Sequence, residues 1–122
     1  MLKVRSVKNG TTPSSEHVVI DVMSDCWLDD FMIMDSTFNH KGEESNKSRH
    51  VYVPEVRSVK KGDVIFLHTA KGTDSSSGAE GSKTIHLYWG LGVCVWNQTG
   101  DMVYLIDLGG MSKSNVQKFP VK

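Results

Sequence analysis

The stretch that decides the fold is Lys60-Lys61-Gly62-Asp63-Val64-Ile65-Phe66-Leu67-His68-Thr69. A basic turn containing glycine leads into a run with the β-branched and aromatic composition of a strand. Comparable short runs, separated by turn residues, occur at residues 2–7, 17–23, 31–36, 51–53, 84–89, 93–97, 101–106 and 115–119. About nine short strands with a turn every 8–12 residues predict an all-β sandwich or barrel.

Residues 70–83 interrupt this pattern. They contain three glycines and three consecutive serines, so we expect a flexible loop within a single domain spanning residues 1–122. Val51-Tyr52-Val53 is short and ends at Pro54, which suits an edge strand.

One segment has an alternative interpretation. Apolar residues between Ser15 and Met34 fall near helical spacing, which would suit a helix with a serine cap. The β-branched run at residues 18–22, and the placement of Ile20 and Leu28 on the wrong face of such a helix, favour strands.

The composition excludes several classes of protein. The 122 residues carry fourteen basic and fourteen acidic side chains, so the formal net charge is zero. This argues against a strongly basic nucleic-acid binder and against an acidic disordered chain. No apolar run approaches the ~20 residues that span a bilayer, and residues 1–6 lack the apolar core of a secretory signal. We therefore expect a soluble globular domain without membrane insertion.

The two cysteines, Cys26 and Cys94, are expected to be free thiols. An immunoglobulin-type bridge would have its tryptophan some way past the first cysteine, whereas Trp27 follows Cys26 immediately. Three matches to the glycosylation acceptor pattern, at Asn9, Asn46 and Asn97, are interpreted as turn residues.

An ordered series of motifs gives the chain a family resemblance. The pieces that carry it are Leu67-His68-Thr69-Ala70-Lys71-Gly72, His86-Leu87-Tyr88-Trp89-Gly90, Trp96-Asn97-Gln98-Thr99-Gly100-Asp101 and Leu105-Ile106-Asp107-Leu108-Gly109-Gly110. This series resembles the lamin tail domain, and the segment Leu28–Asp35 resembles that family's Leu-Ser-Gly-Trp-x-Ile-x-Asp strand. The chain departs from the family where Asp30, Phe31 and Ala70 replace Gly, Trp and Gly.

The resemblance implies an immunoglobulin-like β-sandwich that binds or scaffolds and performs no catalysis. In bacteria such modules usually accompany secreted or envelope-associated proteins. The sequence predicts neither the compartment nor the oligomeric state.

The residues themselves assign no catalytic, cofactor or metal site. His68 and His86 lie on neighbouring predicted strands and are expected to face each other, but no third zinc ligand is spaced for them. Asp101 and Asp107 fit no calcium loop, and Asp29 and Asp30 would point to opposite faces of a strand. The Lys71-Gly72 pair and the serines Ser75, Ser76 and Ser77 lack the strand-to-helix context of a nucleotide loop.

Three functions remain open at this stage. A protein-interaction module is expected to present a flat sheet face or loop end with exposed aromatic residues. A carbohydrate- or nucleic-acid-binding module would offer Tyr52 or Tyr88 as a stacking platform; its basic patch would contain Arg49, Arg57, Lys60 and Lys61. A hydrolase would need a cleft holding His68 or His86 beside Asp or Ser. We expect the first, with the tryptophans, Trp27 and Trp89 among them, mostly buried.

Overall fold

The computed structural model describes residues 1–36, 50–96, 102–109 and 115–121. Within these residues the chain forms eleven strands and two 3₁₀ turns, Pro13–Ser15 and Leu28–Asp30, and no α-helix. The strands are β1 (Leu2–Lys8), β2 (His17–Val22), β3 (Cys26–Trp27), β4 (Phe31–Ser36), β5 (Val51–Tyr52), β6 (Ser58–Val59), β7 (Val64–His68), β8 (Ser75–Ser77), β9 (Thr84–Tyr88), β10 (Met102–Asp107) and β11 (Asn115–Pro120). The prediction of a β-rich chain is confirmed.

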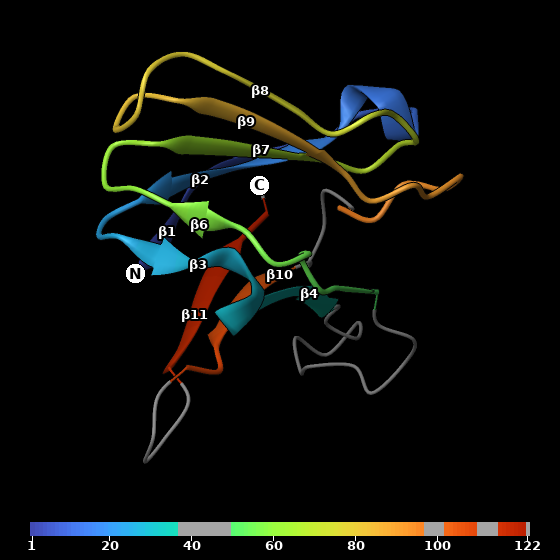
Figure 1. Ribbon diagram of the computed structural model, residues 1–122. Helices are drawn as coiled ribbons and strands as arrows, with labels where there is room; N and C mark the ends of the chain where they lie inside the picture. Colours follow the sequence, from blue (N-terminus) through green and yellow to red (C-terminus); the bar gives the residue numbers. More distant parts are fainter. Residues whose placement is uncertain (37–49, 97–101, 110–114, 122) are drawn as a thin grey trace.

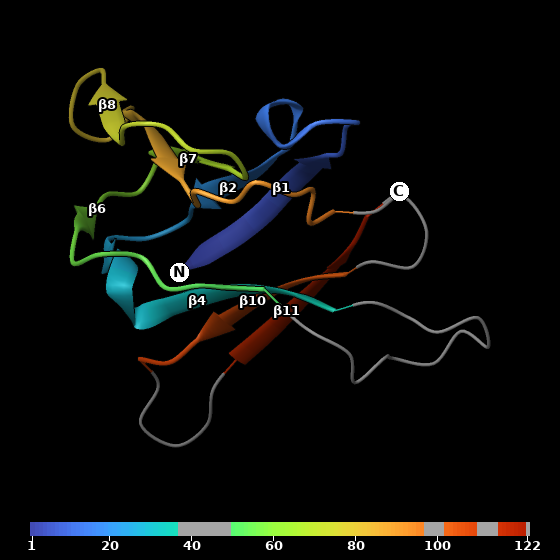
Figure 2. The same ribbon diagram turned by 90° about the vertical axis from the view of Figure 1, so that its right-hand side faces the viewer.

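The strands form two larger sheets and one two-stranded ribbon. The first sheet has the order β1-β2-β7-β9-β8, the second has the order β11-β10-β4-β5, and the ribbon pairs β3 with β6. All pairs are antiparallel except β7 and β9, which run parallel. The five-stranded sheet lies over the four-stranded sheet in both views (Figures 1 and 2). Gln117 on β11 donates a hydrogen bond to the Leu2 carbonyl on β1, so the two sheets also meet along one edge.

One apolar core draws side chains from both larger sheets. On β7 and β9 burial alternates along the strand, so every second side chain points into this core. Each fully buried aliphatic side chain contributes roughly 1.5–3 kcal/mol of transfer free energy. The largest buried side chain is that of Trp96, which is 1% exposed; core aliphatics with 2% exposure or less include Leu2, Val18, Ile20, Leu28, Ile33, Val59, Ile65, Leu67, Ile85, Val103 and Leu105.

Most predicted strands are present, but the one expected at residues 93–97 is wrong over its described part. Residues 93–96 form no strand, and β10 pairs with β4 and β11 instead of with this segment. The physical reason is Glu16, whose carboxylate accepts the backbone N–H groups of Val95 and Trp96 at 2.9 and 3.5 Å. Residues 97–101, the rest of that expected hairpin, lie outside the described part of the chain.

One further expectation about local structure is corrected, and two are confirmed. Within residues 70–83, expected as a flexible loop, Ser75–Ser77 form strand β8 and pair with β9. The preference for strands over a helix between Ser15 and Met34 is confirmed, because these residues form β2, β3 and most of β4 and no α-helix. Val51–Tyr52 lies at the edge of its sheet, as predicted.

Buried carboxylates satisfy backbone donors where the sheet ladders end. Asp63 is 2% exposed and accepts the N–H groups of Lys60 and Lys83 at 2.9 and 3.0 Å, so it joins two turns. Asp35, equally buried, accepts the N–H of His50. A carboxylate that accepts several N–H bonds offsets much of its cost of burial.

We expect Gly62→Ala to lower the free energy of unfolding by at least about 2 kcal/mol. Gly62 has φ +98°, and an added Cβ would lie 2.1 Å from the Gly81 carbonyl oxygen. Gly92→Ala is the matched control, because nothing lies within 4 Å of its Cβ position and its φ is not positive. Urea unfolding of both variants checks this, and equal losses would contradict it.

Candidate functional site

Five ring-bearing side chains gather on the outer side of the five-stranded sheet. We call this the histidine face: His17 on β2, Phe66 and His68 on β7, and His86 and Tyr88 on β9. All five are half-buried, because they occupy the alternate positions that point away from the core. The ladder places His17 opposite His68, His68 opposite Tyr88, and Phe66 opposite His86. The sequence-based expectation that His68 and His86 face each other is confirmed.

The two central imidazoles share a hydrogen bond. His68 Nε2 lies 2.8 Å from His86 Nδ1, and the rings are nearly parallel with centroids 5.1 Å apart. Phe66 stacks on His86 at 5.2 Å, and His17 meets His68 edge-on at 5.8 Å. The rings therefore pack chiefly against one another.

Tyr88 is covered on both sides of its ring. His68 stacks on it at 4.6 Å between centroids, and a Cβ added to Gly72 would lie 2.4–2.7 Å from its ring carbons. A sugar or a base needs an open ring face for stacking. The predicted platform at Tyr88 therefore has no free face. Tyr52, the other predicted platform, packs against Trp89 at 5.7 Å and against the core.

Burial disfavours the protonated form of two rings on the histidine face. Burial, followed by the charges of Lys8 and His86, lowers the pKa of His17. Burial, followed by His86 and His17, lowers the pKa of His68. No carboxylate or hydroxyl in the described ranges hydrogen-bonds to the ring of His68 or of His86. Nor do three or more His, Cys, Asp or Glu residues of that part of the chain form a group able to hold a metal ion.

The other residues considered from the sequence are scattered. Asp29 and Asp30 lie in a 3₁₀ turn and not in a strand, which corrects the expected Leu28–Asp35 strand. Asp107 accepts the N–H of Gly109 at 2.9 Å and so belongs to a turn. Cys26 and Cys94 are free thiols, as expected. Arg49 and Asp101 lie outside the described residues.

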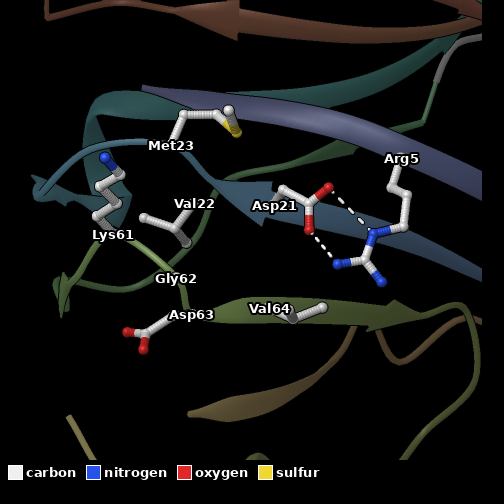
Figure 3. A pocket seen from close by; sticks show the side chains of 8 residues that line it. All are labelled: Arg5, Asp21, Val22, Met23, Lys61, Gly62, Asp63 and Val64. Carbon is white, nitrogen blue, oxygen red and sulfur yellow. Dashed lines mark hydrogen bonds and ion pairs between the residues drawn. The ribbon is translucent and has the colours of Figure 1, made fainter. Parts of the chain in front are cut away.

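A small hollow opens where β2 and β7 meet the turn at residues 61–63 (Figure 3). Its volume is about 320 Å³, and the apolar part of its wall comes from Val22, Met23 and Val64. Arg5 donates two hydrogen bonds to Asp21 across one side of it. The Asp63 carboxylate beside it is occupied by backbone N–H groups, so the acids of the hollow are already paired.

Sequence reasoning missed three exposed apolar side chains on segments that main-chain hydrogen bonds join, and the expectation that Trp27 is buried is wrong. Trp27 on β3 is 54% exposed, Val56 is 74% exposed and Leu108 is 53% exposed. Two main-chain hydrogen bonds join the segments that carry them, from the Leu28 N–H to the Arg57 carbonyl and from the Leu108 N–H to the Asp30 carbonyl, both at 2.7 Å. We call Trp27, Val56 and Leu108 the apolar end. The two-residue ribbon of β3 and β6 has only one buried position on β6, Val59, and none on β3, a signal too short to recognise in the sequence.

Comparisons with known proteins do not assign the chain to a family. No family model matches it, and no curated protein matches it. Within the part of the chain that the structure describes, no helix is long and apolar enough to cross a membrane.

We expect the free energy of unfolding to fall at alkaline pH because of the ionisation of Tyr52. Burial, followed by the negative charges of Asp74 and Glu55, raises the pKa of Tyr52 to about 12 from its ordinary 10.0. The unfolded chain then loses this proton first, so stability present below pH 10 is lost as pH rises toward 12. Tyrosinate absorbance against pH should show a late transition that Tyr52→Phe removes. Titration of all three tyrosines near their ordinary pKa would contradict the expectation.

Proposed function

We propose that this chain is an immunoglobulin-like β-sandwich module similar to the lamin tail domain, and that it binds a protein partner without catalysis. The two stacked sheets with a shared core support the sandwich assignment. Two of the family-like segments lie side by side, since His68 ends β7 and Leu87-Tyr88 ends β9 next to it. The immunoglobulin-like topology and the family both belong to the proposal.

The observation that carries a binding role is the exposure of Trp27. A tryptophan with 54% of its surface in solvent contributes little to the fold and offers a large apolar contact. Tryptophan and arginine are enriched among the residues that dominate binding energy at protein interfaces. Val56 and Leu108 are also exposed, and backbone hydrogen bonds join their segments to residues 28–30 that follow Trp27.

A protein partner fits this surface better than the alternatives. Valine and leucine beside Trp27 supply apolar contact that a sugar or phosphate backbone would not use. The rings of the histidine face lie against one another, which disfavours stacking there. The exposed indole of Trp27 nevertheless makes carbohydrate or nucleic acid the second candidate, because an open aromatic face suits stacking by a sugar or a base.

We expect Trp27→Ala to weaken binding by about tenfold or more while leaving the free energy of unfolding within about 0.5 kcal/mol of wild type. Val93→Ala is the control, since Val93 is 57% exposed and belongs to a different segment. A photo-crosslinker placed next to Trp27 would first identify the partner in a native lysate. The affinity of the purified pair is then measured by titration calorimetry for both variants.

Two outcomes would contradict this function. Binding to the identified protein that is unchanged by Trp27→Ala would remove the apolar end as the contact. Selective, Trp27-dependent binding to glycans or oligonucleotides, with no protein partner captured, would favour the second candidate.

A further inference from the structure

The hydrogen bond between His68 and His86 has a strict proton requirement. One nitrogen must carry a hydrogen and the other must offer a lone pair. With both rings neutral the bond forms, and with one proton added it becomes a charge-assisted bond of greater strength. With both rings protonated, two N–H groups and two positive charges face each other across the 2.8 Å that now separates the nitrogens. The bond is then lost and the rings must separate.

The surroundings of the pair oppose a second added proton. His68 lies over Tyr88 and His86 lies over Phe66, so either cation gains a cation–π contact. On the next strand His17 contacts His68, and Lys8 on β1 lies opposite His17. These neighbours add positive charge when the pH falls.

The carboxylates nearest the pair in the structure or the sequence already accept hydrogen bonds from other groups. Asp74 accepts the backbone N–H of Tyr88, and Asp21 is bonded to Arg5. Glu16, next to His17 in sequence, is fully buried with its carboxylate on Thr69 and Val95. Ser75, opposite His86 on β8, is uncharged. Among the described residues, therefore, no carboxylate hydrogen-bonds to these rings and neutralises a doubly protonated pair.

The pair lies on the ladder that attaches the hairpin of β8 and β9 to the domain. In the described structure β8 pairs only with β9, and β9 joins the rest of the sheet only through β7. Separating His68 from His86 therefore weakens the pairing of β7 with β9, through which both β8 and β9 join the sheet. Segments of a domain can open locally at a lower free energy than the whole domain unfolds.

We propose that the His68–His86 pair is a proton-sensitive latch, which holds the β8–β9 hairpin on β7 with no proton or one proton added and releases it when both rings are protonated. Opening frees the β7 edge, whose N–H and C=O groups are then available to an added strand. The latch belongs to the histidine face and does not depend on the apolar end or on the proposed function.

Amide hydrogen exchange of the intact chain tests the latch directly. Between about pH 7.5 and about pH 5, after correction for intrinsic exchange, protection of β8 and β9 should fall about tenfold relative to β10. His86→Gln keeps a polar side chain that does not ionise, and it should abolish this selective loss. His50→Gln, a histidine outside the face, should behave as wild type.

The wild-type chain provides a second measurement that needs no variant to fold. The imidazole resonances of His68 should follow a two-step titration, because the pair takes up its protons in coupled steps. A single step near the ordinary pKa of histidine, or an equal loss of protection in all strands, would overturn the latch. Saturable displacement of these resonances by micromolar Zn²⁺ at neutral pH would also overturn it, since the pair would then be a metal chelate.

Discussion

The buried carboxylate of Glu16 is the interaction on which the arrangement of the chain depends. Glu16 is 0% exposed and immediately precedes β2. Its Oε1 accepts hydrogen bonds from the Thr69 hydroxyl and the Val95 N–H, and its backbone carbonyl accepts the Thr69 N–H. One side chain thus ties together the start of β2, the end of β7 and the segment that carries Trp96 into the core. The carboxylate replaces hydrogen bonds that a partner strand would supply, so residues 93–96 are held in place without forming a strand.

The same chemistry recurs at Asp63 and Asp35, where buried carboxylates accept N–H groups that no sheet ladder satisfies. Donors left unsatisfied in the interior would cost about 1–3 kcal/mol each. These three carboxylates are buried and serve the fold. Two regions of the surface differ from them in chemistry. The apolar end exposes Trp27, Val56 and Leu108, and the histidine face groups three imidazoles with Phe66 and Tyr88. The proposed binding surface around Trp27 on β3 and the proposed latch between β7 and β9 therefore lie on separate elements.

The sequence predicted the strands well because their alternation is strong. Every second residue of β7 and β9 is apolar and buried, which also placed His68 beside His86 correctly. The strand expected near Val95 failed because its donors go to a carboxylate 79 residues away in sequence, and local pattern carries no sign of such a bond. Trp27 was expected inside because large aromatic side chains usually are. Its exposure follows from a ribbon only two residues long on each side, too small to bury an indole.

The most direct measurement of this account is the free energy of unfolding of Glu16→Ala beside Glu16→Gln. Alanine leaves the donors of Thr69, Val95 and Trp96 without an acceptor, so the account predicts a loss of about 3 kcal/mol or more. Glutamine keeps one acceptor oxygen, and its loss should be clearly smaller. A Glu16→Ala variant within about 0.5 kcal/mol of wild type would show that the segment carrying Trp96 is held by packing alone, and would contradict the account.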